Sequence, residues 1–114
     1  MVYAYPLVTV IIPFRDESRY VVRCLDSILK QDYPPDKIEI LIIDGISEDG
    51  TGPILEKYKK KDDRLKVIDN PKRVIPSALN LGIKEAKGCY IIRLDAHSEY
   101  PVNYISQSIE CAQK

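Results

Sequence analysis

Two uninterrupted apolar runs constrain the fold of this chain more than any other feature of its sequence. Leu7 to Ile12 is mostly β-branched and ends at a proline, and Ile40 to Ile43 ends at the dipeptide Asp44-Gly45. Neither run alternates apolar with polar residues, which is typical of strands that are covered on both faces. The runs therefore predict two central strands of a parallel sheet. Leu65 to Ile68 and Tyr90 to Leu94 are weaker patterns that predict two more strands.

Helix signals lie between and after the predicted strands. Ser18 can cap a first helix, and Thr51 precedes a second. Pro76 opens a third helix that Gly88 closes, and a last helix is expected from Pro101 onward. This alternation implies right-handed crossovers, with helices on both faces of a mostly parallel sheet. We therefore expect the whole chain to form one three-layer α/β/α domain of Rossmann-like architecture.

The formal net charge of the chain argues against two classes of binding partner. Seventeen Lys and Arg residues against seventeen Asp and Glu give a formal net charge of zero, which excludes the basic footprint of a nucleic-acid or anionic-membrane binder. The three cysteines have no CxxC spacing, so neither a disulfide framework nor a zinc site is indicated. No run approaches the roughly 20 apolar residues of a membrane span, and no signal peptide is recognisable. We expect a soluble, cytoplasmic chain.

Polar side chains follow all four predicted strands. They are Arg15, Asp16 and Glu17; Asp44, Ser47 and Asp49; Lys72 and Arg73; and Asp95 and His97. Ligands of parallel sheets bind outside the carboxyl ends of the strands, so these side chains are expected at one edge. Carboxylates beside basic groups suit a phosphate ligand that is bridged by a divalent cation. Asp95 and His97 can share such a cation, because carboxylate oxygen and imidazole nitrogen both bind divalent metals.

The common phosphate-binding sequences are absent. There is no Walker sequence, and no GxGxxG follows the first predicted strand. A receiver domain would carry paired acids directly on that strand, whereas Pro13-Phe14-Arg15 intervenes here. Each acid also has a structural alternative. Asp44-Gly45 is a common turn dipeptide, Asp49 is an ordinary helix cap, and Asp95 can cap the helix that follows.

Three blocks of the chain resemble successive motifs of one enzyme family. They are Val8–Glu17 (VTVIIPFRDE), Ile43–Thr51 (IDGISEDGT) and Ser77–His97 (SALNLGIKEAKGCYIIRLDAH). Their order and spacing are similar to those of the nucleotide-sugar-binding half of family 2 glycosyltransferases, which have the GT-A fold. Asp95-Ala96-His97, in place of the family's D-x-D signature, resembles the succinoglycan-type polysaccharide glycosyltransferase subset. The resemblance implies that residues 1–114 form the donor-binding half of a truncated GT-A domain, with the acceptor-binding half absent.

The resemblance also implies a role for each motif residue. The implied nucleotide-sugar-binding residues are Pro13, Phe14, Arg15, Glu17, Asp44, Arg73 and Asp95. In the family pattern Glu17 would reach the base or ribose, and Asp44 would accept a hydrogen bond from the base. Arg73 would face the diphosphate. Asp95 and His97 would hold a divalent metal.

The implied cofactor is Mn²⁺ or Mg²⁺, and His97 favours Mn²⁺ because imidazole is a poorer ligand for Mg²⁺. The ion would bridge the diphosphate of a nucleoside diphosphate sugar, with a UDP-sugar as the first expectation. The reaction would be an inverting glycosyl transfer in polysaccharide or glycolipid synthesis. The carboxylate base of this family lies downstream of the D-x-D block, so it is expected beyond Lys114 and the chain alone is expected to be inactive. Full-length relatives can associate with the cytoplasmic face of a membrane.

A second class of function stays open at this point. A chain that contains only the donor half can be a non-catalytic nucleotide-binding or self-associating module. Loss of the acceptor half would leave a sheet edge and apolar surface uncovered, and such surfaces drive association. We therefore expect a homo-oligomer, or a partner chain that covers the edge.

Overall fold

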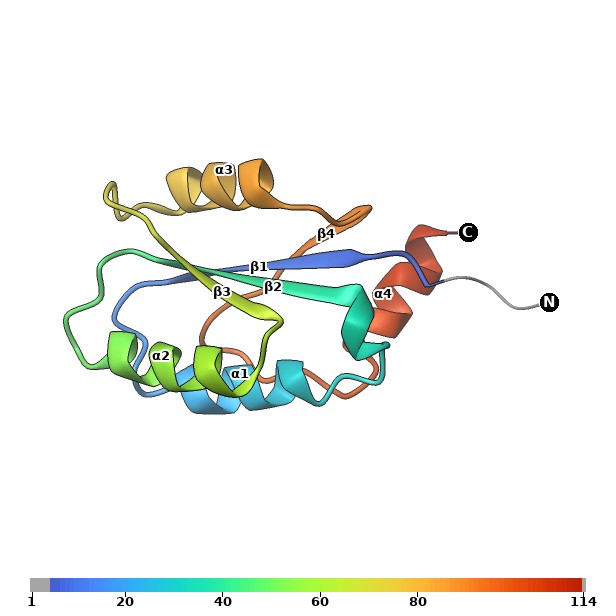
Figure 1. Cartoon of the computed structure of the whole chain (residues 1–114), viewed down its shortest axis with the longest axis horizontal. Coiled ribbons are helices and arrows are strands. Elements are labelled where there is room, and N and C mark those ends of the chain that lie inside the picture. Colours follow the sequence, from blue (N-terminus) through green and yellow to red (C-terminus); the bar gives the residue numbers. More distant parts are fainter. Residues whose placement is uncertain (1–4, 114) are drawn as a thin grey trace.

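A four-stranded parallel sheet lies at the centre of the computed structural model, which describes residues 5–113 (Figure 1). The elements, in chain order, are β1 (Val8–Phe14), α1 (Val21–Leu29), the 3₁₀ turn η1 (Pro35–Lys37), β2 (Ile38–Asp44), α2 (Thr51–Lys61), β3 (Leu65–Asp69), α3 (Ile75–Glu85), β4 (Tyr90–Arg93) and α4 (Tyr104–Ala112). All four predicted strands are present, and each lies within two residues of its predicted bounds.

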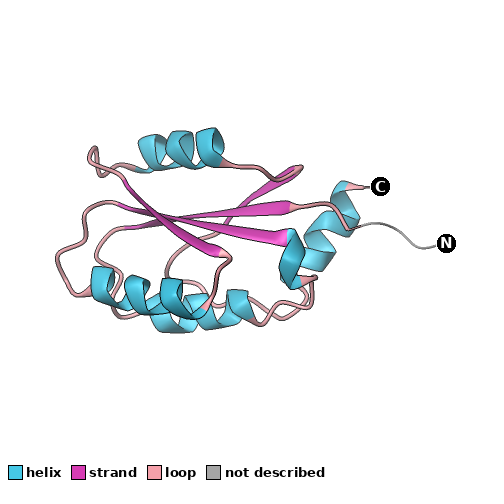
Figure 2. Ribbon diagram, in the orientation of Figure 1, coloured by secondary structure: helices cyan, strands magenta, loops and turns pink. Residues whose placement is uncertain are grey.

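The strands are ordered β3-β2-β1-β4, and all neighbouring pairs are parallel. Helix α3 covers one face of the sheet and α1 and α2 cover the other, with α4 at one end (Figures 1 and 2). The predicted three-layer α/β/α class is therefore confirmed. The chain moves from β1 outward to β3 and then crosses to β4 on the opposite side of β1. Ligands of open α/β sheets bind at such a reversal, which here lies between β1 and β4.

The two central strands are buried on both faces. In β1, Val10 and Ile12 belong to the large core on the α1 side, while Ile11 belongs to a smaller core under α3. Successive side chains of a strand point to opposite faces, so both faces need apolar residues and the sequence runs show no alternation. Gly82 brings α3 close to the sheet, because a Cβ there would lie 2.7 Å from Cγ2 of Ile11.

Pro13 marks the place where the sheet opens. β4 pairs with β1 only as far as Ile11, which lies opposite Arg93. The next hydrogen bond on this side runs from the Leu94 N–H to the Ile11 carbonyl at 3.0 Å. Backbone groups two residues apart point to the same side of a strand, so Pro13 directs its hydrogen-free nitrogen toward β4 where pairing has ended. The proline costs the sheet no hydrogen bond, and the gap between β1 and β4 begins beside it.

Two predicted helix starts were wrong. Ser18 does not cap α1, because the Tyr20 and Val21 N–H groups donate to the Glu17 carbonyl at 2.9 and 3.0 Å and the resulting turn separates Ser18 from the helix start at Val21. Pro101 does not open α4, which begins at Tyr104; the Tyr104 N–H donates to the Pro101 carbonyl at 3.0 Å and closes a turn before the helix.

Gly88 does not close α3, as the sequence pattern predicted. The helix ends at Glu85, and the φ of Gly88 is not in the left-handed region. A Cβ at this position would lie 2.5 Å from the backbone nitrogen of Thr9. The Gly88 N–H donates to the Thr9 hydroxyl at 2.9 Å, and that hydroxyl donates to the buried Glu39 carboxylate at 2.7 Å. Close approach to β1, and not helix capping, requires the glycine.

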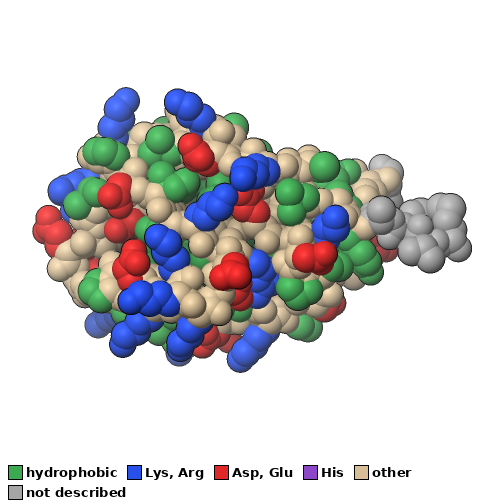
Figure 3. Space-filling model, viewed as in Figure 1, with side chains coloured by type: hydrophobic (Ala, Val, Ile, Leu, Met, Phe, Trp, Pro, Cys, Tyr) green, Lys and Arg blue, Asp and Glu red, His purple; other side chains and the backbone are tan. Residues whose placement is uncertain are grey.

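The surface carries both signs of charge. Lys and Arg side chains are interspersed with Asp and Glu over most of the face shown in Figure 3, in agreement with the formal net charge of zero. The longest helices, α2 and α3, have 11 residues each. No helix within residues 5–113 has the length and apolar character that crossing a membrane requires.

Candidate functional site

A cleft lies at the carboxyl ends of the strands, beside the gap between β1 and β4. Four segments form it: the end of β1, the end of β2, the loop from β3 into α3, and the residues after β4. The lining residues are Pro13, Phe14, Arg15, Glu17, Ile43, Gly45, Asn70, Arg73, Val74, Ile75, Ala78, Arg93, Asp95, Ala96 and His97. The cleft therefore coincides with the binding position that the strand order predicts.

The structure brings together seven of the eight predicted binding and metal residues. Those that line the cleft are Pro13, Phe14, Arg15, Glu17, Arg73, Asp95 and His97. Asp44 is the exception, since it is only 8% exposed and does not line the cleft. Its neighbours Ile43 and Gly45 do line it. Asp44 thus lies next to the cleft and is not open to it.

The turn after β2 holds the Asp44 carboxylate. The Ser47 hydroxyl donates to Oδ1 at 2.5 Å, and the Ser47 N–H lies 3.3 Å from Oδ1 and 3.4 Å from Oδ2. The backbone is fixed as well, because the Gly45 N–H donates to the Phe14 carbonyl at 2.8 Å and the Asn70 N–H to the Asp44 carbonyl at 2.7 Å. Oδ2 keeps the capacity to accept a further hydrogen bond.

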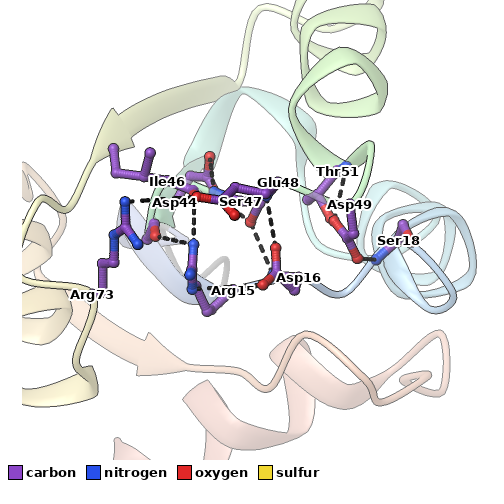
Figure 4. A network of polar contacts seen from close by, with 11 residues as sticks. Arg15, Asp16, Ser18, Asp44, Ile46, Ser47, Glu48, Asp49, Thr51 and Arg73 are labelled. Carbon is purple, nitrogen blue, oxygen red and sulfur yellow. Dashed lines mark hydrogen bonds and ion pairs between the residues drawn. The ribbon is translucent and has the colours of Figure 1, made fainter.

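Asp16 joins the loop after β1 to the loop after β2 (Figure 4). Its N–H donates to the Ser47 hydroxyl oxygen at 3.0 Å, and its carboxylate accepts a hydrogen bond from the Glu48 N–H at 2.7 Å. Because the same Ser47 hydroxyl donates to Asp44, these contacts form a relay from the backbone of Asp16 to the Asp44 carboxylate. The orientation of Asp44 thus depends on the loop after β1.

Asp49 makes a second connection between these loops (Figure 4). Its carboxylate accepts hydrogen bonds from the Ser18 N–H at 3.0 Å, the Thr51 N–H at 3.2 Å and the Thr51 hydroxyl at 2.5 Å. The Thr51 hydroxyl bond, followed by the Ser18 amide, holds the pKa of the Asp49 carboxyl well below its ordinary value. Asp49 therefore ties the first turn of α2 to the segment before α1.

Arg15 and Arg73 differ in how many of their guanidinium groups' hydrogen-bonding positions are used by other residues of the protein. Arg15 donates through Nη1 to the Gly45 carbonyl at 2.8 Å and to the Ile46 carbonyl (Figure 4). Arg73 lies 3.9 Å from the Glu48 carboxylate, and its side chain is 46% exposed. Arg15 is thus largely used in holding the loop after β2, and Arg73 is the more available guanidinium for an anionic ligand.

Three non-glycine residues within residues 5–113 adopt a left-handed φ, one after each of the first three strands. They are Asp16 at 52°, Ile46 at 58° and Arg73 at 61°. This conformation is unfavourable, above all for a β-branched residue such as Ile46. It persists where the surroundings over-determine the backbone, which often happens at ligand sites. The hydrogen bonds of Asp16 and the two carbonyls bound by Arg15 supply that constraint here.

Asp95 and His97 alternate with buried neighbours. Leu94 is 2% and Ala96 is 3% exposed, whereas the side chains of Asp95 and His97 are 56% and 61% exposed. β4 has ended at Arg93, and Ala96 and His97 lie in a turn, but both polar side chains line the cleft. The predicted pair is therefore brought together by backbone anchoring in the core.

The Asp95 and His97 side chains have only loose contacts of their own. The Asp95 carboxylate lies 3.8 Å from the Arg93 guanidinium, and His97 Nδ1 lies 3.7 Å from the Glu17 carboxylate. The Tyr20 ring meets the His97 ring edge to face, with centroids 6.2 Å apart. Glu17 and His97 come from loops 80 residues apart in the sequence, so the fold joins the first and last motifs at this point.

The donor groups of this pair fit a divalent metal that a ligand completes. No cluster of three or more His, Cys, Asp and Glu side chains suited to a metal occurs within residues 5–113. An exposed carboxylate and an exposed imidazole on one side of a strand end are nevertheless suitable ligands. Metal ions at phosphate sites are commonly held by one or two protein ligands together with water and phosphate oxygens. Asp95 and His97 match that smaller requirement.

The sequence patterns missed two polar residues of the cleft. Asn70 is 2% exposed. Its side-chain N–H donates to the Val74 carbonyl at 3.0 Å, and its side-chain oxygen accepts a hydrogen bond from the Ser77 hydroxyl at 2.8 Å. Asn70 therefore fixes the start of α3. The Asn-Pro dipeptide after β3 was the available signal. Arg93 also lines the cleft. It precedes Asp95 by two residues in a strand pattern, and that spacing predicts a common face.

Comparisons with known proteins identify relatives over nearly the whole chain. The family model described as glycosyl transferase family 2 matches residues 9–114. A dolichyl N-acetyl-alpha-D-glucosaminyl phosphate 3-beta-D-2,3-diacetamido-2,3-dideoxy-beta-D-glucuronosyltransferase of Methanococcus voltae is 36% identical over 109 residues, which cover 94% of this chain and 34% of that protein. The succinoglycan biosynthesis protein ExoA of Rhizobium meliloti is 33% identical over 105 residues, covering 90% and 32% respectively. The chain thus spans about a third of the length of these relatives.

Solved structures agree in fold. The mannosyltransferase PcManGT from Pyrobaculum calidifontis, in complex with GDP-Man and Mn²⁺, superposes with a TM-score of 0.80 at 32% identity, over 86% of this chain and 29% of that one. S. aureus TarS 1–349 in complex with UDP gives a TM-score of 0.81 at 25% identity, over 94% and 32%. The strand order, the motif blocks and these matches lead to one assignment: the chain belongs to glycosyl transferase family 2 and has the GT-A fold.

Proposed function

We propose that residues 1–114 are the donor-binding half of an inverting glycosyltransferase, and that they bind a nucleoside diphosphate sugar, with a UDP-sugar as the preferred candidate, together with Mn²⁺ or Mg²⁺. One observation carries this proposal. Four separate segments converge on a single cleft that carries three guanidinium groups, two carboxylates and an imidazole. That mixture suits a diphosphate and a metal cation bound together. The carboxylates would repel a diphosphate bound alone, and the guanidinium groups would repel a cation bound alone.

The base and the diphosphate are proposed to bind at different ends of the cleft. The nucleoside would lie against Pro13 and Phe14 at the end of β1, with Glu17 reaching its base or ribose. Asp44 would accept a hydrogen bond from the base through its less occupied oxygen, Oδ2. A small movement of the Gly45 turn would expose this oxygen, since Asp44 adjoins the cleft.

The diphosphate would lie at the β4 end. Arg73 would bind the phosphates directly, and Asp95 and His97 would hold the metal. When bound, the metal supplies positive charge to the diphosphate as it leaves the anomeric carbon. The chain's own contribution is to orient the donor so that an acceptor hydroxyl attacks the opposite face of the sugar, which inverts its configuration.

No residue of this chain is assigned as the base for the acceptor. We propose that a carboxylate from another part of a longer protein deprotonates the acceptor hydroxyl. The relatives support this view, since the chain covers about a third of their length. The structural relatives also support a nucleotide-sugar donor: TarS structures are in complex with UDP and with UDP-GlcNAc, and the PcManGT structure is in complex with GDP-Man and Mn²⁺.

Calorimetric titration with UDP, with and without Mn²⁺, tests the proposal. Asp44→Ala removes a hydrogen-bond acceptor and Asp95→Ala removes a metal ligand, so each should weaken UDP binding in the presence of Mn²⁺ by about 10-fold or more. Asp69→Ala is the matched control, because Asp69 is an exposed acid at the end of β3 that does not line the cleft. Unchanged affinity in both site variants would contradict the assignment.

Self-association is a second candidate role, supported by exposed apolar side chains near α3. Ile75 is 49%, Ile83 is 55% and Ile91 of β4 is 46% exposed. Light scattering at micromolar concentration should then give a mass above that of the monomer. A monomeric mass would contradict this candidate and leave the donor-binding proposal untouched.

A further inference from the structure

The segment after β4 is fixed through its backbone, and a tyrosine supplies the fixing group. From this we infer that Tyr100 is the positioning residue for Asp95 in the donor site, acting through a hydrogen bond to the Asp95 main chain. The inference rests on the proposed donor-binding function, because it concerns what Asp95 does there. It adds a residue outside the three motif blocks, five positions after Asp95.

The Tyr100 hydroxyl contacts both backbone groups of Asp95. The Asp95 N–H donates to Tyr100 Oη at 2.7 Å, and Oη lies 3.4 Å from the Asp95 carbonyl oxygen. Asp95 lies beyond the last residue of β4, so its N–H has no strand partner and needs another acceptor.

Tyr100 is itself anchored to α1. Its N–H donates to the Ser27 hydroxyl oxygen at 3.0 Å, and that hydroxyl donates to the Cys24 carbonyl within the helix at 2.7 Å. The Cys24 thiol in turn lies 3.5 Å from the Asp95 carbonyl. These contacts form a closed circuit through α1, Tyr100 and the backbone of Asp95.

Gln31 extends the anchor to the following turn. Its amide donates to the Pro101 carbonyl at 2.6 Å, and its side-chain oxygen accepts the Ile105 N–H at 2.9 Å. Gln31 is 7% exposed, so water does not compete strongly with these bonds. Tyr100 is thus held from the α1 side and from the α4 side.

The anchor explains how an exposed carboxylate can be placed accurately. Among residues 5–113 the Asp95 side chain has only the Arg93 guanidinium at 3.8 Å as a charged partner, so its own contacts do not fix it. Its backbone is set by Tyr100, and from a fixed backbone a short side chain has few rotamers. Removal of the hydroxyl should therefore loosen the metal-binding end of the cleft and leave the nucleoside end intact.

The test is Tyr100→Phe, with Tyr104→Phe as its matched control. The Tyr104 ring packs against the Tyr100 ring at a tilt of 60°, with centroids 4.9 Å apart. The Tyr104 hydroxyl forms no hydrogen bond with a residue of the described part of the chain. Both variants keep the paired rings, and only Tyr100→Phe removes the bond to Asp95. The measurements are UDP affinity with and without Mn²⁺, uridine affinity, and hydrogen exchange of the Asp95 amide.

We expect Tyr100→Phe to reduce the gain in UDP affinity that Mn²⁺ provides by about 10-fold, to leave uridine affinity within about twofold, and to speed exchange of the Asp95 amide. Tyr104→Phe should do none of this. A merely structural role would lower uridine and UDP affinity together, which would overturn the inference, as would an unchanged Mn²⁺-dependent gain. If the unaltered chain showed no Mn²⁺-dependent binding of UDP, the proposed function itself would be wrong. If the unaltered chain binds as proposed and Tyr100→Phe behaves like it, only the role of Tyr100 is wrong, so the two failures are distinguishable.

Discussion

The cleft has two ends that are built in opposite ways. At the end of β2, Asp44 is only 8% exposed, and its carboxylate accepts a hydrogen bond from the Ser47 hydroxyl at 2.5 Å. At the end of β4, the side chains of Asp95 and His97 are more than half exposed, and their nearest charged partners lie 3.7 to 3.8 Å away. Left-handed residues follow β1, β2 and β3, and within residues 5–113 none follows β4.

The difference matches what each end is proposed to bind. A heterocyclic base is rigid and presents fixed donors and acceptors, so a fixed carboxylate recognises it well. A diphosphate with its metal brings strong charges that attract exposed partners, and those partners gain their final geometry when the ligand completes the coordination. The comparison predicts that changes at the β2 end alter stability as well as affinity, and that changes at the β4 end alter affinity alone.

The largest expected effect is on stability and comes from Ser47→Ala. The substitution removes the hydroxyl that donates to Asp44 and accepts from the Asp16 N–H. Loss of both bonds should lower the free energy of unfolding by about 2 kcal/mol. Urea denaturation measures it, with Ser108→Ala as control, because that hydroxyl only bonds to the Tyr104 carbonyl of its own helix at 2.7 Å. Equal stability of the two variants would break the comparison.

His97→Ala should give the next largest effect, on affinity alone. The exposed imidazole contributes little to folding, so the free energy of unfolding should change by less than about 0.5 kcal/mol. UDP affinity in the presence of Mn²⁺ should fall about 10-fold, because one metal ligand is lost. Glu99→Ala is the control in the same loop, since Glu99 pairs with Arg23 at 3.9 Å and does not line the cleft. A loss of stability without a loss of affinity would reverse the assignment.

The smallest expected effect is a pH dependence at Asp49. Its pKa is depressed by the Thr51 hydroxyl and the Ser18 amide, so the folded state favours the charged form. The resulting stability is fully present above the unfolded pKa of about 3.9 and is lost as the pH falls further. Thermal unfolding of Asp49→Asn and the unaltered chain between neutral pH and pH 3 should show a difference in Tm that shrinks below about pH 4. A difference that grows with acid would have the wrong sign.

The fold could be predicted from its strands better than from its helix ends. The two central strands, β1 and β2, are buried on both faces and therefore appear in the sequence as uninterrupted apolar runs. The edge strands β3 and β4 are only partly buried, and their weaker patterns were still enough to find them. Helix starts depend on which partner a capping group meets. Ser18 has the residue type of a cap, yet a turn separates it from Val21, and its N–H donates to Asp49, 31 positions away. Gly88 has the residue type of a helix end, yet the closeness of Thr9 explains it. Neither contact is visible in local sequence.

The site shows the same division. Position after a strand was enough to predict that Glu17, Arg73, Asp95 and His97 would share one cleft, because parallel strands end at a common edge. The sequence did not predict that Asp44 is buried and bound by Ser47, because the burial of this carboxylate depends on the conformation of the turn that follows β2. Whether these residues bind a nucleotide sugar remains a prediction that the titrations test.

The alkylation rate of the buried Cys24 thiol can measure how often the segment after β4 opens. Cys24 is 0% exposed, and burial, followed by the charges of Asp95 and Glu17, raises its pKa to about 12. Such a thiol reacts with an alkylating reagent only while the segment above it is open. Cys89 and Cys111 are exposed and would react at once, so serine at both positions would leave one slow thiol. Its alkylation half-life then reports the opening equilibrium of the segment, and a bound ligand that holds Asp95 would lengthen it.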